Sequence, residues 1–191
     1  MLSPRDRVFL ATFTTLLVAL VCTVHALIYM DRLPSRVPSH FDGSGNPNSW
    51  SSKGTVLGVY MATVWGLVVI FLVVGWLITI TPMEYVNLPN KEYWLATPLR
   101  RTETYTYLFT VFQIWGASTN AFMLFVFQLM FSAAINGEAL SNLFWFGFAV
   151  YMLATAAFSI SLALRFRRLP ADAQPVAAAS LRSGQKQQLL I

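Results

Sequence analysis

Charged residues and cysteine are both scarce in this chain of 191 residues. Asp, Glu, Lys and Arg make up 11% of it and hydrophobic residues 56%, whereas soluble proteins contain about 25% charged residues. The single cysteine, Cys22, excludes an intramolecular disulfide and a thiolate metal cluster. Its position inside an apolar run favours a buried, unreactive thiol. This composition excludes an ordinary soluble domain and indicates a membrane protein.

Recognisable catalytic motifs are also missing. The sequence has no nucleophile elbow, no His-Glu-x-x-His pair and no close pair of carboxylates suited to general acid/base catalysis. The net charge of +5 is confined to the ends and loops instead of forming the basic face that binds nucleic acid. We therefore expect a protein that is not an enzyme and has no cofactor and no nucleic-acid partner.

Four apolar runs are each long enough to cross the hydrocarbon core of a bilayer, which takes about 20 helical residues. They cover residues 8–30, 55–80, 105–133 and 143–164. The first run is longer than the apolar core of a secretory signal, so we interpret it as an uncleaved anchor. The sequence predicts an all-α membrane domain, a four-helix bundle over residues 1–169, followed by a disordered tail over residues 170–191.

Lys and Arg are distributed unevenly between the two sides of these runs. One side carries Arg5, Arg7, Lys91, Arg100, Arg101, Arg165, Arg167, Arg168, Arg182 and Lys186, and the other carries Arg32, Arg36 and Lys53. Basic residues concentrate on the cytoplasmic side of membrane proteins. We therefore predict a multi-pass protein of the bacterial cytoplasmic (inner) membrane, with both termini inside and the segment 33–53 outside.

This outward segment, residues 33–53, has a composition that hydrophobicity alone does not explain. Its three prolines fix φ and its two central glycines permit positive φ, which predicts a series of turns instead of a helix. Phe41 and Trp50 are expected to anchor it at the membrane interface. We predict a partner-binding loop whose residues are Pro38, His40, Phe41, Asp42, Gly45, Asn46, Trp50 and Lys53.

Oxygen-bearing side chains alternate between Asp42 and Asn48. An EF-hand is excluded, because Pro47 and Lys53 occupy the positions that need glycine and glutamate. Asx-type turns account for the same residues, and calcium bound in another geometry is an alternative.

Two histidines and two carboxylates lie in outward segments: His25, His40, Asp42 and Glu138. Such a set would suit zinc or another divalent metal if it converged. No spacing fixes two of these ligands on one helix face, so a loop histidine bonded to the turn backbone is the favoured interpretation. A metal-dependent extracytoplasmic enzyme is kept as an alternative.

The inward segment, residues 82–104, holds a second dense motif containing Pro89, Asn90, Tyr93 and Trp94. We predict one helical turn over residues 90–95, capped by Asn90, with the two aromatic side chains at the membrane interface.

The third apolar run carries amide side chains. Gln113, Gly116, Asn120 and, less closely, Gln128 fall near one helical face, which is typical of contacts between membrane helices. A small transporter of lipid or a neutral solute that uses this face is a further alternative. No Asp, Glu, Lys or Arg falls within the four predicted spans, which argues against a proton relay.

The outward motif resembles a known family. It follows a first membrane helix and consists, in order, of Leu33-Pro34, Val37-Pro38, His40-Phe41-Asp42, Gly45-Asn46-Pro47, Trp50 and Lys53. This arrangement is similar to domain of unknown function 1648. That domain resembles the N-terminal half of SdpI-type immunity proteins, which protect their producer from a secreted peptide toxin. The resemblance implies a membrane protein with signature positions in this loop, but the second SdpI membrane domain, with its Gly-x-Arg-Thr-Pro-Trp-type motif, has no counterpart here.

We therefore expect a non-enzymatic receptor, immunity-like protein or accessory subunit of a membrane complex. Its outward loop would dock a peptide or a partner protein on the extracytoplasmic side, and its spans would contact membrane lipids.

Overall fold

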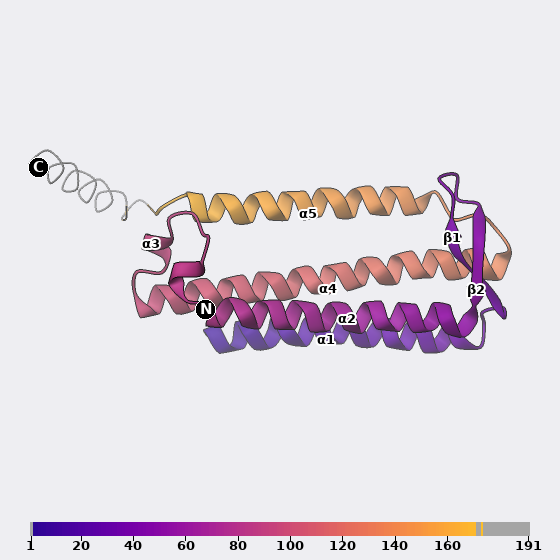
Figure 1. The fold of residues 1–191 in the computed structure, drawn as a ribbon, viewed down its shortest axis with the longest axis horizontal. Helices are drawn as coiled ribbons and strands as arrows, with labels where there is room; N and C mark the ends of the chain where they lie inside the picture. Colours follow the sequence, from indigo (N-terminus) through magenta and orange to yellow (C-terminus); the bar gives the residue numbers. More distant parts are fainter. Residues whose placement is uncertain (1, 171–172, 174–191) are drawn as a thin grey trace, which may run out of the picture.

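A computed structural model of the protein describes residues 2–170 and 173. The elements are α1 (Pro4–Met30), β1 (Arg36–Phe41), β2 (Pro47–Ser52), α2 (Lys53–Ile80), a 3₁₀ turn η1 (Met83–Tyr85), α3 (Lys91–Trp94), α4 (Pro98–Asn136) and α5 (Leu143–Arg167). The four long helices run along the molecule, with the β-hairpin at one end and α3 at the other (Figure 1). All four are long and apolar enough to cross a membrane. Most of the predicted tail, with Arg182 and Lys186, lies outside the described residues.

Helix α1 packs through a stripe of small side chains. Its buried residues are Ala11, Thr15, Ala19, Cys22 and Ala26, spaced three or four apart on one face. Small residues at this spacing let helix backbones approach closely, which drives association where lipid tails are as apolar as a side chain. The helix begins at a Ser3 cap, with the reciprocal Asp6 contact of a capping box.

Helix α4 uses its amides against α2, as predicted. Gln113 Nε2 donates to the Phe71 carbonyl at 2.9 Å, and Asn120 Nδ2 lies 3.4 Å from the Val64 carbonyl. Both amide side chains are fully buried. Gly116 lies against the ring of Phe71 so closely that an added Cβ would come within 2.6 Å of its Cγ.

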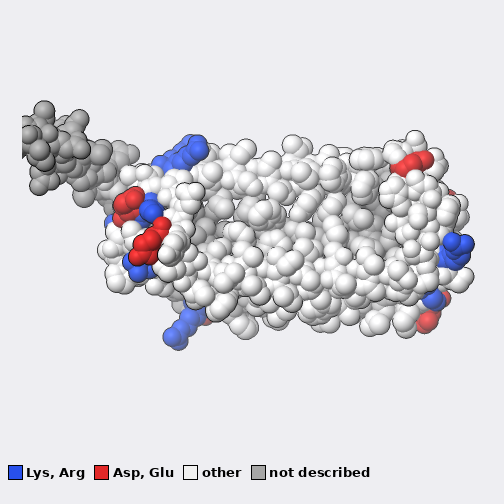
Figure 2. All heavy atoms as spheres, in the orientation of Figure 1, with Lys and Arg blue, Asp and Glu red and all other residues white. Residues whose placement is uncertain are grey.

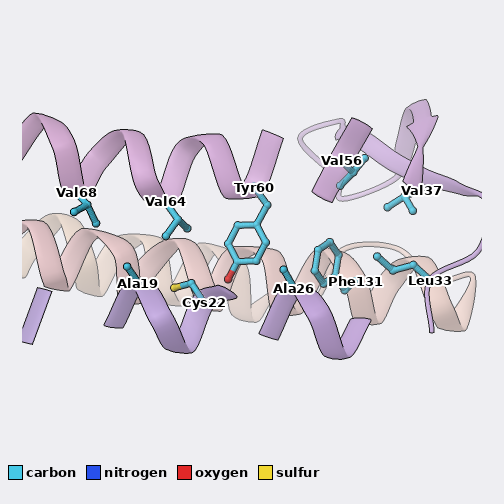
Figure 3. Close-up of a cluster of buried hydrophobic side chains, with 10 residues drawn as sticks. All are labelled: Ala19, Cys22, Ala26, Leu33, Val37, Val56, Tyr60, Val64, Val68 and Phe131. Carbon is cyan, nitrogen blue, oxygen red and sulfur yellow. The ribbon is translucent and has the colours of Figure 1, made fainter. Parts of the chain in front are cut away.

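A hydrophobic cluster fills the space between α1, α2 and α4 and continues to the hairpin (Figure 3). Tyr60 and Phe131 are its largest fully buried members, and Leu33 and Val37 extend it beyond the helices. We call α1, α2 and α4 the three-helix unit. The connection after α1 and the first hairpin strand are thus part of its core.

Helix α5 lies beside α4 with few contacts. Phe122 of α4 stacks on Tyr151 at 4.4 Å between ring centroids, and the Tyr151 hydroxyl is 2.8 Å from that of Thr119. Phe166, near its end, is its single buried residue. The predicted four-helix bundle is therefore confirmed only in part. Helix α5 has no amide side chains, and its small residues Ala154, Ala157 and Ser161, although at helical spacing, are exposed instead of packed against a neighbour.

The all-α prediction is wrong at the outward segment. Strands β1 and β2 form an antiparallel sheet from Arg36–Ser52 to Phe41–Pro47. The prolines do not prevent this pairing because of where they lie: Pro38 borders an irregularity in the register and Pro47 is the first residue of its strand. Proline is tolerated at such positions, where its missing N–H interrupts no regular ladder. The expected turns are confined to the hairpin tip.

Charged residues lie at the two ends of the molecule, with an uncharged surface between them (Figure 2). We call them the hairpin end and the terminal end, the second being the end at which α1 begins and α5 finishes. Among the described residues, the terminal end carries Arg5, Arg7, Lys91, Arg100, Arg101, Arg165, Arg167 and Arg168, and the hairpin end carries Arg32, Arg36 and Lys53.

Candidate functional site

The base of the hairpin is fixed to the three-helix unit. Val37 is fully buried and Pro38 is buried beside it. The Lys53 backbone N–H donates to the Ser35 carbonyl at 3.0 Å, which closes the hairpin where α2 begins. Ser52 caps α2 by accepting a hydrogen bond from the Thr55 N–H. Pro38 and Lys53 therefore hold the hairpin in place.

The tip of the hairpin is an Asx-type turn, as predicted. One carboxylate oxygen of Asp42 accepts hydrogen bonds from the Ser44 and Asn46 N–H groups, both at 2.9 Å. These bonds, that from Asn46 first, lower the pKa of the fully exposed Asp42 carboxyl. Gly45 has a φ of +83°, a conformation that favours glycine.

The tip is tied to the connection between α4 and α5. Leu140 N–H donates to the Gly45 carbonyl at 2.8 Å. A Cβ on Gly45 would come within 2.8 Å of the Leu140 carbonyl oxygen, so a side chain is excluded there by space as well as by φ. The glycine pattern predicted a turn, but nothing in the sequence indicated which segment the turn contacts.

His40, Asn48 and Trp50 are exposed on the two strands. His40 Nδ1 lies 2.6 Å from Asn48 Oδ1, so its partner is a side chain on the opposite strand instead of the turn backbone we expected. Trp50 lies opposite Pro38 and is 46% exposed. Together with Asn46, these residues give the hairpin an accessible polar and aromatic surface.

A cavity of about 490 Å³ lies between the hairpin tip and the start of α5. Its polar side includes His40 and Asp42, and its apolar side includes Phe41, Met130, Phe144 and Trp145. We call it the hairpin cavity. It brings together four residues of the predicted partner-binding loop, His40, Phe41, Asp42 and Gly45, with two aromatic residues of α5. The sequence did not single out these two, because they lie about a hundred positions further along the chain.

The four candidate metal ligands do not converge. His25 lies within α1, where its Nε2 is 3.0 Å from Gln128 Oε1 and its ring stacks on Phe131. His40 and Asp42 have the hairpin partners given above, and Glu138 follows the end of α4. Within residues 2–170 and 173, no three His, Cys, Asp or Glu side chains group in a way that could hold a metal ion.

The predicted inward motif contacts the end of α5. Asn90 Nδ2 donates to the carbonyls of Phe166 and Arg167, both at 3.0 Å, and Trp94 Nε1 donates to the Phe166 carbonyl at 3.1 Å. These carbonyls belong to the last turn, where a helix lacks its own donors. Asn90 adopts a left-handed φ of 54° and makes no side-chain cap, so its predicted capping role is wrong. It binds α5 instead, while Pro89 is exposed.

Tyr93 is half-buried, and the guanidinium of Arg100 lies 4.1 Å from its ring centroid. The aromatic side chains of this motif therefore contact α5 and a basic residue of α4, which the spacing of the motif alone did not indicate.

The family comparison identifies one segment of the chain. Residues 17–78 match the family model described as Domain of unknown function (DUF1648). The match runs from within α1 through the hairpin to near the end of α2, so it contains most of the candidate site and confirms that resemblance. Comparisons with curated proteins and with solved structures find no match. The similarity to SdpI-type proteins stays a prediction.

Proposed function

We propose that this chain is a non-enzymatic protein of a bacterial cytoplasmic membrane, and that its hairpin end faces outward and docks an extended peptide segment. The segment belongs either to a free peptide or to the extracytoplasmic face of a partner protein. The observation that carries the proposal is the hairpin cavity, formed by a fixed hairpin and the start of α5.

The distribution of basic residues supports this orientation. Of the described Lys and Arg, eight lie at the terminal end and three at the hairpin end, by the two groups named above. Excess Lys and Arg marks the side that stays in the cytoplasm. The hairpin then extends from the outer surface of the membrane, where it can meet a secreted peptide or a partner.

The rigidity of the hairpin supports docking. Its base is closed by the Lys53 to Ser35 bond, and its tip is held by the Asp42 turn and by the bond from Leu140 to Gly45. A surface that is already ordered loses little conformational entropy when a ligand binds.

The lining of the hairpin cavity indicates what it would accept. Phe144 and Trp145 offer an apolar wall to a hydrophobic side chain, whereas His40 and Asp42 lie at the polar side. Pockets that combine an apolar surface with a few polar groups are typical of specific recognition. An extended segment that inserts one hydrophobic residue and bonds to the polar side fits this surface.

A photo-crosslinking residue at Gly43 tests the proposal in living cells. Gly43 lines the cavity, and an added Cβ meets no atom within 4 Å, so the probe does not disturb the hairpin. We expect a discrete adduct whose crosslinked site maps to one peptide segment. It should be strongly reduced by His40→Ala combined with Trp145→Ala.

The control places the same probe at Tyr85, which is 80% exposed and lies at the terminal end. The same adduct from both positions, or an adduct unaffected by the cavity substitutions, would rule out docking at the hairpin cavity. Unchanged co-purification of the mapped partner with Trp50→Ala and with His40→Ala would count against the exposed hairpin residues in the same way.

A further inference from the structure

A second cavity, of about 210 Å³, lies at the terminal end among α1, α3, α4 and α5. Its charged lining consists of Arg7, Arg100, Glu103 and Arg165. We call it the arginine cavity. It lies at the opposite end of the molecule from the hairpin cavity, and nothing about it depends on the function proposed for the hairpin.

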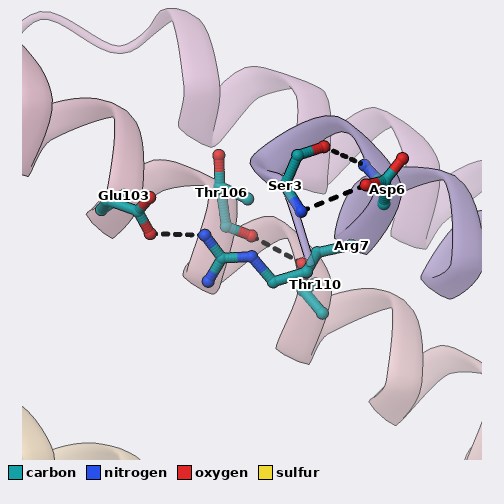
Figure 4. A network of polar contacts seen from close by, with 6 residues as sticks. All are labelled: Ser3, Asp6, Arg7, Glu103, Thr106 and Thr110. Carbon is teal, nitrogen blue, oxygen red and sulfur yellow. Dashed lines mark hydrogen bonds and ion pairs between the residues drawn. The ribbon is translucent and has the colours of Figure 1, made fainter. Parts of the chain in front are cut away.

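The charges of the arginine cavity are not balanced. Arg7 donates to the Glu103 carboxylate, which joins α1 to α4 (Figure 4). Among the residues that the structure describes, no other carboxylate lies within ion-pair distance of an arginine. The cavity lining therefore holds three guanidinium groups and one carboxylate, which is paired with Arg7, and this leaves a positive excess at the cavity.

Aromatic rings hold the two arginines that lack a carboxylate. The guanidinium of Arg100 lies 4.1 Å from the Tyr93 ring centroid, and that of Arg165 lies 3.9 Å from the Tyr107 centroid. Stacking fixes a guanidinium plane but leaves the N–H donors along its edge available. In addition, Nε of Arg7 is buried and has no hydrogen-bond partner. The cavity thus combines positioned cations with unused donors.

The position of the cavity matches the headgroup layer of a bilayer. Arg7 and Arg100 lie in the first turns of α1 and α4, and Arg165 lies in the last turn of α5. The rest of the lining, which includes Trp94, Leu99 and Phe166, is largely aromatic or apolar. Basic pockets between membrane helices at this level bind anionic headgroups.

The size and the donors restrict the ligand. A volume near 210 Å³ is smaller than the roughly 300–1,000 Å³ of pockets for drug-sized ligands, so a headgroup-sized anion fits and a large ligand does not. The planar donor fork of arginine matches the oxygens of phosphate. We propose that the arginine cavity binds a phosphate group, supplied by the headgroup of an anionic lipid or by free phosphate.

The test uses the full chain in nanodiscs and two matched double variants. Arg100→Gln/Arg165→Gln removes two charges from the cavity lining. Arg101→Gln/Arg167→Gln removes the same charge from the same helices, at positions one and two residues away that do not line the cavity. Discs of phosphatidylcholine, with or without phosphatidylglycerol, are compared by native mass spectrometry for the lipid retained after extraction. Thermal unfolding with inorganic phosphate in phosphatidylcholine discs forms the second arm.

We expect the unsubstituted chain to retain phosphatidylglycerol in preference to phosphatidylcholine. The cavity variant should lower this preference about tenfold, which corresponds to about 1.4 kcal/mol, while the control variant keeps it. Preferential retention identifies a lipid headgroup as the source. Stabilisation by inorganic phosphate that is lost in the cavity variant alone identifies free phosphate.

Equal loss of preference in both double variants would overturn the proposal, because it would show attraction by the overall charge of this end. The absence of both a lipid preference and a phosphate effect in the unsubstituted chain would also overturn it. If the double cavity variant does not fold, Arg165→Gln is compared with Arg167→Gln by the same two measurements, with the same criteria.

Discussion

The three-helix unit and α5 are both built from long apolar helices, yet they pack very differently. Small side chains on α1 and amides on α4 bury the contacts within the unit. Helix α5 contacts α4 mainly through aromatic rings, its small residues are largely exposed, and only Phe166 is buried. Because lipid tails are as apolar as these side chains, hydrophobicity alone does not bring α5 into the unit. Close packing here requires small or hydrogen-bonding residues at the interface.

The two candidate sites lie where α5 is attached. The hairpin cavity uses Phe144 and Trp145 from the start of α5, and the arginine cavity uses Arg165 and Phe166 from its end. The tightly packed three-helix unit and the loosely packed α5 should therefore respond differently to substitution. Substitutions in the unit should affect the stability of the whole protein, whereas those at the ends of α5 should affect local structure and binding.

Gly116→Leu should have the largest effect on stability. The Cβ of the introduced leucine would come within 2.6 Å of the Phe71 ring, between α4 and α2. Overpacking of this kind costs about 1–3 kcal/mol in the free energy of unfolding, measured in detergent by denaturant titration. Gly66→Leu, at a position on α2 with no neighbour within 4 Å, is the matched control and should be nearly neutral. Equal effects of the two would contradict close packing in the unit.

Gly147→Leu tests the same idea on α5. A Cβ here would collide with the outer edge of the Phe125 ring. That ring is half-buried, so both it and α5 can move aside. We expect a loss of at most about 1 kcal/mol, the low end for overpacking, in the same titration. Ala154→Leu, at an exposed position on α5, is the control. A loss as large as that of Gly116→Leu would mean that α5 is part of a tightly packed bundle.

Asn90→Gly should loosen only the end of α5. Glycine keeps the left-handed backbone but removes the bonds to the Phe166 and Arg167 carbonyls. We expect faster hydrogen exchange in the last turn of α5, by an amount equivalent to about 0.5–1.5 kcal/mol for each lost bond. Asn90→Ala should add the strain of a left-handed alanine, about 1 kcal/mol. Identical exchange in Asn90→Gly and the unsubstituted chain would disprove the attachment.

The smallest effect concerns the pH dependence of the hairpin tip. Hydrogen bonds lower the folded-state pKa of Asp42 below its unfolded value. The stability that the Asp42 carboxylate gives to the turn is therefore complete above the unfolded-state pKa, about 3.9. It is lost as pH falls through the folded-state pKa. We expect amide exchange of Ser44 and Asn46, corrected for intrinsic rates, to accelerate in that acidic range and not near neutral pH. The same profile in Asp42→Ala would assign the effect to another group.

The sequence predicted the four spans well because length and hydropathy are local properties. It predicted their ends less well: α4 begins at Pro98, seven residues before the predicted start, since Arg100, Arg101 and Glu103 extend the helix beyond the apolar run. The loose packing of α5 could not be predicted, because α5 also carries small residues at helical spacing, Ala154, Ala157 and Ser161, and the sequence does not show that they are exposed.

The candidate site was predicted in part. The loop residues were identified from their composition, and the Asx turn from Asp42 and its neighbours. The strands were missed because the prolines were interpreted without the register that accommodates them. Leu140, Trp145 and the lining of the arginine cavity other than Tyr93 and Trp94 were missed because their neighbours are distant in sequence. Only the fold brings such residues together.

Thiol labelling of Ser44→Cys and Leu99→Cys tests the central claim most directly. Ser44 is exposed at the hairpin tip, Leu99 is 73% exposed at the terminal end, and the native Cys22 is buried. In intact cells treated with a membrane-impermeant maleimide, we predict labelling of Ser44→Cys alone, with Leu99→Cys labelled only after permeabilisation. Labelling of Leu99→Cys in intact cells while Ser44→Cys stays protected would reverse the orientation and contradict docking at the hairpin end.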